Sequence, residues 1–329
     1  MPGELHIYDG MITFDSITLV PGYSEISSRS EVDVSTTIKG VKSNIPIINA
    51  NMHAVCTPHM IKALDKANVF SSYHRFFSNE KIRNNTLKDE LVTINKDLFF
   101  PSVGVQSSDY EFVDWLIDNG FKNLIVDVNH GHHIKVKHII EYITKKSSTI
   151  TIMAGNVSTN DGIKFLADAG ADIIKVGNSF GFSCTTLPST GFGVHPLHAA
   201  KTYREETGDW DTALCIDGGV KNVSDIAKSL IYSDIVMLGK MFAGTTESNG
   251  KFITGQTKEY YGNASAMTKE MSNNHVKYIE GGVRTVPWVG NVENLLTIIE
   301  EGLQSAFSFV GASNLSEYQT RAVKNILEL

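Results

Sequence analysis

A cysteine on a glycine-containing loop is the most reactive feature of the sequence. Cys184 lies in the segment Lys175-Val-Gly-Asn-Ser-Phe-Gly-Phe-Ser-Cys-Thr-Thr186, where the strand-like run 171–176 ends in a loop with Gly177 and Gly181. Cysteine is a strong nucleophile near neutral pH, and its thiolate is stabilised by loop amides or a nearby cation. The segment therefore predicts a nucleophile beside a small ligand.

The other cysteines give no sign of a disulfide or a zinc site. The chain has three cysteines, at positions 56, 184 and 215, and no two of them are spaced as a metal-binding pair. Cys215 lies in the apolar run Ala213–Ile216 and is expected in the core. The segment 1–9 does not resemble a signal peptide, so we expect reduced thiols and a cytoplasmic protein.

Composition excludes several classes of function. The chain has 329 residues, of which 42% are hydrophobic and 20% charged, as in a soluble globular protein. No apolar run is long enough to span a membrane, and the net charge of -7 comes without any block of Lys and Arg. We therefore expect no nucleic-acid partner and no membrane association.

Short apolar runs recur along the chain and alternate with helical patterns. Several runs are continuously apolar, as expected for parallel strands buried on both faces. The eight candidate strands are Ile45–Ile48, Val69–Ser72, Pro101–Gly104, Asn123–Asp127, Thr149–Met153, Asp172–Val176, Ala213–Ile216 and Asp234–Leu238.

Helices are predicted between these strands. Ser107–Asp118, Thr159–Ala169 and Val223–Ile231 carry apolar residues at helical spacing, with Asn160 and Asn222 as candidate N-caps. Eight strand–helix units favour a closed (β/α)8 barrel, and a doubly wound open sheet is the alternative. In a barrel, the residues that follow each strand converge on one face and form the site.

The chain is expected to form one domain over residues 1–329. Residues 245–289 contain few apolar runs and resemble an extended, mobile flap over the barrel mouth. Two closing helices are predicted at Asn291–Gln304 and Ser316–Leu327.

Many short motifs, in order along nearly the whole chain, resemble the IMP dehydrogenase/GMP reductase family. They include the first-strand segment, the fourth and fifth strand ends, the cysteine loop and the glycine pairs that follow it. These motifs are Phe14–Pro21, Pro46–Met52, Asp127–His132, Ala154–Val157, Gly177–Thr186, Thr190–Gly193, Ile216–Gly219, Met237–Gly239, Tyr261-Gly262, Glu280-Gly281 and Val310–Ala312.

The resemblance implies covalent bonding between the cysteine and C2 of a purine nucleotide. Two reactions are open: NAD-dependent oxidation of IMP, or NADPH-dependent reductive deamination of GMP to IMP and ammonia. Three features favour the reductase: there is no room for a regulatory CBS pair, the segment between Tyr261 and Glu280 is short, and that segment has no arginine. The dehydrogenase uses an Arg-Tyr pair on a long flap to activate water.

The resemblance also assigns roles to residues. Cys184 would attack C2, while Thr186 and Glu280 would protonate the departing amine. The substrate would contact Asp217, Gly218, Gly219, Gly239, Lys240, Tyr261, Asn263, Ser265 and Gly281. The NADPH cofactor would contact Arg75, Asp127, His130, Gly131 and Asn156. Backbone carbonyls of Gly177, Ser179 and Cys184 would bind a monovalent cation such as K⁺, and family members are usually homotetramers.

The departures from the family cluster in the cysteine loop. A glycine and a proline of the family pattern are replaced by Ser179 and Phe180, which changes backbone freedom where phosphate and cation should bind. Lys240 replaces a small residue near the phosphate and could supply a compensating charge. We therefore expect retained covalent chemistry with altered nucleotide recognition, on GMP or a related guanine nucleotide. A dehydrogenase without CBS domains and a nucleotide-binding homologue with altered or no catalysis are the alternatives.

Overall fold

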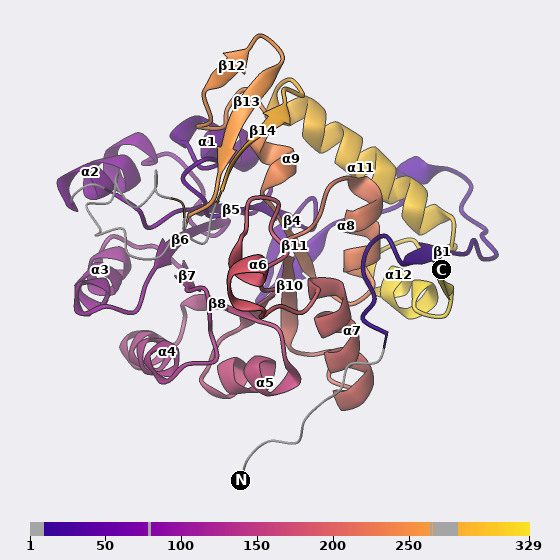
Figure 1. Ribbon diagram of the computed structural model, residues 1–329, viewed down its shortest axis with the longest axis horizontal. Coiled ribbons are helices and arrows are strands. Elements are labelled where there is room, and N and C mark those ends of the chain that lie inside the picture. Colours follow the sequence, from indigo (N-terminus) through magenta and orange to yellow (C-terminus); the bar gives the residue numbers. More distant parts are fainter. Residues whose placement is uncertain (1–9, 78–79, 264, 266–281) are drawn as a thin grey trace.

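Eight parallel strands form a nearly closed barrel at the centre of the molecule (Figure 1). This computed structural model describes residues 10–77, 80–263, 265 and 282–329. The strands follow the order β4-β11-β10-β9-β8-β7-β6-β5, and all hydrogen-bonded neighbours are parallel. The predicted (β/α)8 barrel is thereby confirmed, and the alternative of a doubly wound open sheet is excluded. The strands are β4 Ile47–Asn49, β5 Ser71–Tyr73, β6 Phe99–Val103, β7 Asn123–Asp127, β8 Thr151–Val157, β9 Ile173–Val176, β10 Ala213–Asp217 and β11 Ile235–Leu238.

A side chain closes the seam between β4 and β5, the two ends of this sheet. The Ser72 backbone N donates to Asn49 Oδ1 at 2.7 Å, and Asn49 Nδ2 donates to the Ser72 carbonyl at 2.9 Å. Ser72 Oγ donates to the Asn49 carbonyl at 2.6 Å. The Asn49 amide therefore takes the place of a backbone partner in the ladder.

Helices form the outer ring around the barrel (Figure 1). Asn222 caps α8 by accepting from the Asp225 backbone N, as predicted. The predicted cap Asn160 is wrong, because Thr159 accepts from Gly162 N and Asn160 is already helical. The helices are α1 Pro58–Lys66, α2 Glu80–Asn85, α3 Ser107–Asp118, α4 Ile134–Lys146, α5 Asn160–Asp168, α6 Thr186–Thr190, α7 Pro196–Thr207, α8 Val223–Leu230, α9 Lys240–Ala243, α11 Val292–Ser308 and α12 Leu315–Ala322, with short helical turns at Arg29–Glu31 and Thr86–Glu90.

Apolar side chains fill the barrel interior. A hairpin of β2 Thr36–Ile38 and β3 Val41–Ser43 adds Ile38 to this cluster. Cys215 is fully buried there, which confirms its expected place in the core. Other members of the interior cluster are Ile48, Phe70, Phe100, Ile125, Met153, Ile173, Ile235 and Met237.

In its described residues, the segment expected to be an extended flap contains a three-stranded antiparallel sheet. Its strands are β12 Phe252–Thr254, β13 Thr257–Tyr261 and β14 Val283–Pro287, and they project together from the barrel (Figure 1). Most of β14 is exposed, so its sequence lacks the apolar run by which a strand is recognised. Lys258 is buried in β13, and its Nζ donates to the carbonyls of Thr245 and Ser248 at 2.6 and 3.0 Å.

The chain ends in a strand rather than in the long helix predicted to reach Leu327. Helix α12 stops at Ala322, and β15 Ile326–Glu328 pairs antiparallel with β1 Ile17–Leu19. A partner so distant in the sequence leaves no local signal. Among the described residues, no helix is long and apolar enough to cross a membrane.

Candidate active site

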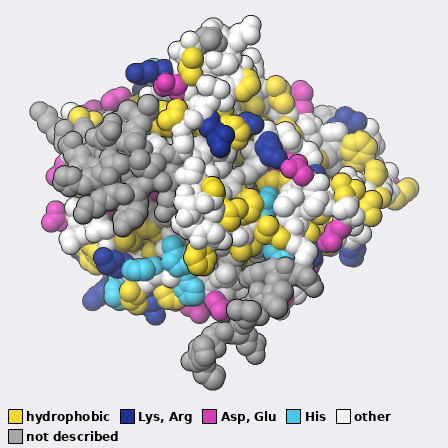
Figure 2. All heavy atoms as spheres, in the orientation of Figure 1, with side chains coloured by type: hydrophobic (Ala, Val, Ile, Leu, Met, Phe, Trp, Pro, Cys, Tyr) yellow, Lys and Arg dark blue, Asp and Glu magenta, His cyan; other side chains and the backbone are white. Residues whose placement is uncertain are grey.

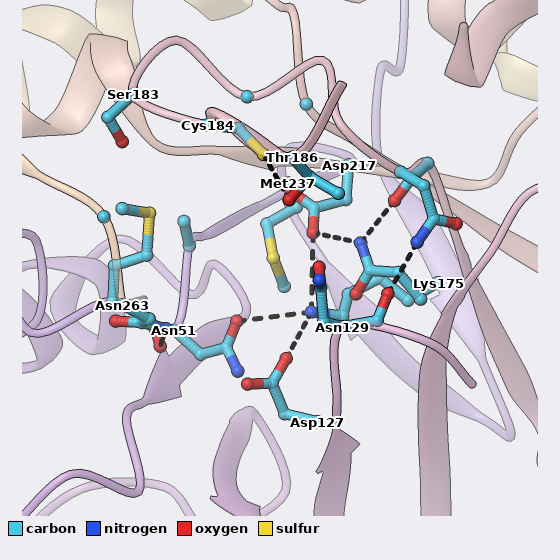
Figure 3. Close-up of a pocket in the computed structure, with 18 of the residues that line it drawn as sticks. Asn51, Asp127, Asn129, Lys175, Ser183, Cys184, Thr186, Asp217, Met237 and Asn263 are labelled. Atoms are coloured by element: carbon cyan, nitrogen blue, oxygen red, sulfur yellow. Dashed lines mark hydrogen bonds and ion pairs between the residues drawn. The ribbon is translucent and has the colours of Figure 1, made fainter. Parts of the chain in front are cut away.

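A cavity of about 570 Å³ opens at the carboxyl ends of the barrel strands, within the size range of small-molecule sites (Figure 3). The structure brings ten of the predicted site residues to its wall. They are Arg75, Asp127, Asn156, Gly177, Ser179, Cys184, Thr186, Asp217, Gly218 and Asn263.

The predicted nucleophile lies beside its predicted partner. Cys184 Sγ and Thr186 Oγ1 are 3.3 Å apart and hydrogen-bonded (Figure 3). Cys184 is half-buried and Thr186, the first residue of α6, is buried. The thiol and the hydroxyl can therefore act on neighbouring atoms of a ligand in the cavity.

The divergent part of the cysteine loop is held by its own side chains. Ser179 adopts a left-handed backbone conformation with φ of 73°, and its Oγ donates to the Phe192 carbonyl at 2.6 Å. The Phe180 ring meets the edge of His195, with ring centroids 5.0 Å apart. These contacts explain how serine and phenylalanine are accommodated at these two positions.

The expected monovalent-cation site fits the structure only in part. The Gly177 carbonyl already accepts a hydrogen bond from Asn156 Nδ2 at 2.7 Å, whereas the contact of Ser179 with Phe192 uses its side-chain Oγ and does not involve its carbonyl. The cation therefore stays a prediction, and no chemical step below depends on it.

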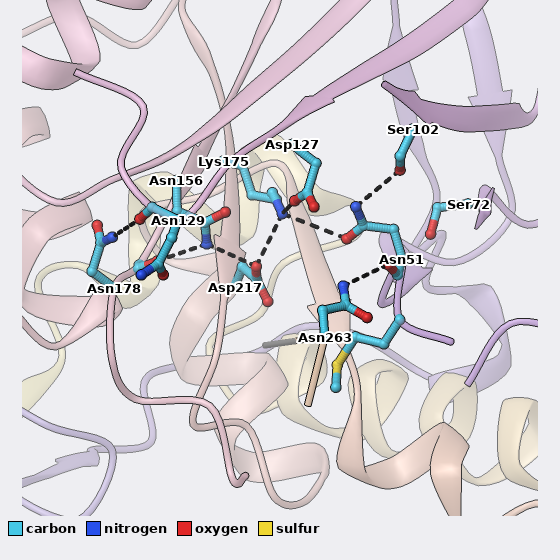
Figure 4. A network of polar contacts seen from close by, with 12 residues as sticks. Asn51, Ser72, Ser102, Asp127, Asn129, Asn156, Lys175, Asn178, Asp217 and Asn263 are labelled. Atoms are coloured by element: carbon cyan, nitrogen blue, oxygen red, sulfur yellow. Dashed lines mark hydrogen bonds and ion pairs between the residues drawn. The ribbon is translucent and has the colours of Figure 1, made fainter. Parts of the chain in front are cut away.

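A buried lysine connects two carboxylates across the cavity floor (Figure 4). Lys175 Nζ lies 2.7 Å from Asp127 Oδ1, 3.4 Å from Asp217 Oδ2 and 3.5 Å from Asn51 Oδ1. Burial opposes the charge of Lys175, but the two carboxylates outweigh it and raise the pKa of the ammonium group. Burial likewise opposes ionisation of Asp127, but Lys175 and then Arg75 lower the pKa of its carboxyl.

Sequence reasoning did not assign Lys175 to the site. The signal was a lysine inside the otherwise apolar strand Ile173–Val176, because a buried charge requires a partner. Asn51 lies in the predicted first-strand motif Pro46–Met52 but was given no role; its amide lies at the cavity wall and donates to Ser102 Oγ at 2.9 Å.

A second cavity of about 170 Å³ adjoins the first and shares Asp217 and Gly218 with it. The Lys240 ammonium lies 4.4 Å from the centroid of the Phe182 ring. Here the structure brings together the glycines and the lysine expected at a phosphate. The wall of this cavity includes Gly218, Gly219, Lys221, Gly239, Lys240 and Tyr260.

Tyr260, and not the expected Tyr261, faces both cavities. Successive side chains of β13 point to opposite sides of the strand. Tyr261 therefore points away, and its hydroxyl is hydrogen-bonded to His53 Nδ1 at 2.8 Å. Burial and then the Asp217 charge raise the pKa of Tyr260, which keeps its hydroxyl a hydrogen-bond donor.

The predicted residues near the flap divide into two groups. Asn263 lines the main cavity, donates to the Asn51 carbonyl at 3.0 Å and accepts from His53 N at 3.2 Å. Ser265 is buried and is absent from the wall of either cavity. Glu280 and Gly281 lie outside the described residues.

The predicted cofactor residues are also only partly brought together. Arg75 and Asp127 line the cavity, and the buried Arg75 Nε has no hydrogen-bond partner among the described residues. Asn156 lines it too, with Nδ2 2.9 Å from Asp217 Oδ2. Gly131 donates to the Asn156 carbonyl but is not part of the cavity wall.

His130 is exposed and also lies away from the cavity wall. Its ring centroid is 6.4 Å from that of His132, and histidine side chains gather at the lower left of the face in Figure 2. Within the described ranges, no group of three or more His, Cys, Asp or Glu side chains could hold a metal ion.

The fold and the cavity define a (β/α)8 barrel with a cysteine at a small-molecule site. Residues 11–326 match the model of the IMP dehydrogenase/GMP reductase domain. The chain is 34% identical to the GMP reductase of Lactobacillus acidophilus, over 92% of this chain and 91% of that protein. It is 33% identical to the GMP reductase of Streptococcus agalactiae, over 96% and 94% of the two chains. The chain therefore belongs to the IMP dehydrogenase/GMP reductase family.

Proposed function

We propose that this protein is a GMP reductase-like oxidoreductase that converts GMP, or a related guanine nucleotide, to IMP and ammonia with NADPH. The observation that carries the proposal is the hydrogen-bonded Cys184–Thr186 pair in the wall of the main cavity. The names of the relatives support this direction of the reaction.

The two adjoining cavities suit the parts of a nucleotide. The purine would lie against Cys184 in the larger cavity. Asp217 lines both cavities, and its carboxylate can accept hydrogen bonds from the ribose hydroxyls. The 5′-phosphate would enter the smaller cavity, where Gly218 and Gly239 lack side chains and Lys240 supplies a positive charge.

The chemistry would proceed by covalent catalysis. The Cys184 thiolate adds to C2 of the purine, and the C2–N2 bond then breaks as ammonia leaves with a proton. Thr186 would deliver that proton together with Glu280, whose role rests on the resemblance to the family because it lies outside the described residues. In the second half-reaction C2 gains a hydride, the C2–S bond breaks, and the thiolate is restored.

A nicotinamide cofactor would supply the hydride and leave oxidised. The residues present fit such a group, because Arg75 Nε is a buried donor without a hydrogen-bond partner in the described part of the chain and lies at the cavity wall. Arg75 and Asp127 would hold and orient the cofactor, with Arg75 Nε 3.9 Å from Asp127 Oδ2.

The test is to follow absorbance of the reduced nicotinamide with GMP, dGMP or modified guanine nucleotides, together with ammonia release. We expect NADPH oxidation with a guanine nucleotide, equimolar ammonia, and a rate at least about a thousandfold lower in Cys184→Ala. Full activity of Cys184→Ala would remove the nucleophile assignment. NAD reduction with IMP would instead identify a dehydrogenase, and nucleotide-induced stabilisation without any turnover would identify a binding protein.

A further inference from the structure

Lys175 occupies a position that no step of the proposed reaction uses. It projects from β9 into the barrel, and its side chain is only 3% exposed. The neighbouring strand β8 makes room for it: a Cβ on Gly155 would lie 2.6 Å from the Lys175 Cβ. A buried ammonium beside the main cavity calls for a functional explanation, because burying a charge is costly.

Its contacts show that Lys175 serves the protein rather than the ligand. An ammonium group has three protons to donate, and three oxygen acceptors surround this one. Asp127 on β7, Asp217 on β10 and Asn51 after β4 supply them. The side chain therefore spans the floor of the cavity, with its ammonium group directed at oxygens of the protein itself (Figure 4).

The two carboxylates lie on the sides of the cavity that are assigned to different ligands. Asp127 lies near Arg75 on the side assigned to the cofactor. Asp217 lies beside Asn156 and Gly218 and borders the smaller cavity on the nucleotide side. Lys175 and Arg75 together balance the two negative charges, so removing Lys175 would leave the floor with one uncompensated anion.

We propose that Lys175 is a positioning residue that holds Asp127 and Asp217 at fixed sites, so that one side chain organises both the cofactor side and the nucleotide side of the cavity. This inference rests on the proposed function for the identity of the ligands, but not for the coupling between the charges.

The experiment compares Lys175→Met, Lys175→Arg and the double variant Lys175→Met/Asp127→Asn. The dissociation constant of GMP is measured by calorimetry without cofactor, and KM for GMP, KM for NADPH and kcat are measured separately. We expect Lys175→Met to weaken GMP binding and to raise the NADPH KM, each by at least about tenfold. The double variant, which restores the net charge balance of the cavity floor, should recover GMP binding by about threefold or more, and Lys175→Arg should recover part of both.

Arg204→Met provides a matched control. Arg204 is a fully buried cation paired with Asp234 at 3.1 Å, and it does not line the cavity. This variant should lower the melting temperature but keep the GMP dissociation constant and both KM values within about twofold. A merely structural role for Lys175 would give the same pattern in Lys175→Met, and that result would overturn the proposal.

Unfolding of the same variants separates this proposal from the proposed function. If the wild-type protein binds neither GMP nor IMP, the proposed function fails, whereas the charge coupling is still measurable. The double variant should then be more stable than Lys175→Met alone. Equal stability of the two variants would contradict the coupling whatever the ligand is.

Discussion

His195 shows how a single residue supports the divergent cysteine loop. Its ring lies between Phe180, at 5.0 Å, and Phe14, at 4.7 Å between centroids. Its Nδ1 accepts from the Leu197 backbone N and caps α7. Burial, and to a lesser extent Lys221, lowers the pKa of His195 to about 4. The neutral ring is therefore the form that the folded loop requires.

The depressed pKa of His195 predicts a pH-dependent stability. The unfolded chain takes up a proton below about pH 6.5, whereas the folded protein does so only near pH 4. The stability that the neutral His195 ring contributes to the free energy of unfolding is therefore fully present above the unfolded-state pKa. It is lost as the pH falls through this window. We expect the wild type to lose on the order of 2 kcal/mol more stability than His195→Asn between pH 7 and pH 5.

Urea unfolding at both pH values measures this difference. The buried His74, whose pKa burial lowers well below its usual value, adds a slope common to both proteins. Substitution of the exposed His59 is the control, and it should not alter the change in the free energy of unfolding between pH 7 and pH 5. Parallel slopes for the wild type and His195→Asn would show that the ring is not held neutral.

The register of strand β13 determines which tyrosine faces the two cavities. Tyr260 faces the cavities, and Tyr261 contacts His53 on the other side of the strand. The sequence analysis assigned Tyr261 to the nucleotide, but the sequence does not determine which of the two adjacent tyrosines faces the cavities. That choice depends on the register of a sheet whose third strand, β14, comes after a long connection.

Substitution of each tyrosine by phenylalanine separates the two faces of β13. Tyr260→Phe should raise KM for the nucleotide by about three- to tenfold, because a donor beside the smaller cavity is lost. Tyr261→Phe should keep KM within about twofold but cost about 1 kcal/mol of stability through the lost bond to His53. Steady-state kinetics and urea unfolding of both variants provide the comparison, and the opposite assignment of effects would show that Tyr261 serves the ligand.

The barrel as a whole could be predicted from the sequence, and several contacts that complete it could not. The continuous apolar runs determined the eight strands, with Asn123–Asp127 predicted to the residue. The strand-end rule brought Cys184, Thr186 and Asp217 together correctly. Lys175 was missed because its partners lie on other strands, and such pairing depends on the closed sheet rather than on neighbouring residues.

The closure of that sheet depends on Asn49. Asn49→Ala removes the acceptor of the buried Ser72 backbone N and the amide donor to the Ser72 carbonyl, which keeps only the weaker bond from Cys56 Sγ at 3.3 Å. We expect a loss of about 3 kcal/mol or more in the free energy of unfolding. Amide hydrogen exchange should accelerate most at Ser72. Ser72→Ala is the control, since it removes only the bond from Oγ, and an equal loss in the two variants would rule out the side-chain seam.

Lys258 gives the root of the projecting sheet an unusual kind of attachment. Its ammonium group is enclosed by the carbonyls of Thr245 and Ser248 and by the Ser248 hydroxyl at 2.7 Å, which are the ligands that a dissolved metal cation would use. Here the cation is part of the polypeptide, so it cannot dissociate or be replaced by another ion. The oxygens between the sheet and the turn after α9 should therefore stay bound to the Lys258 ammonium group, whatever the ionic composition of the surroundings.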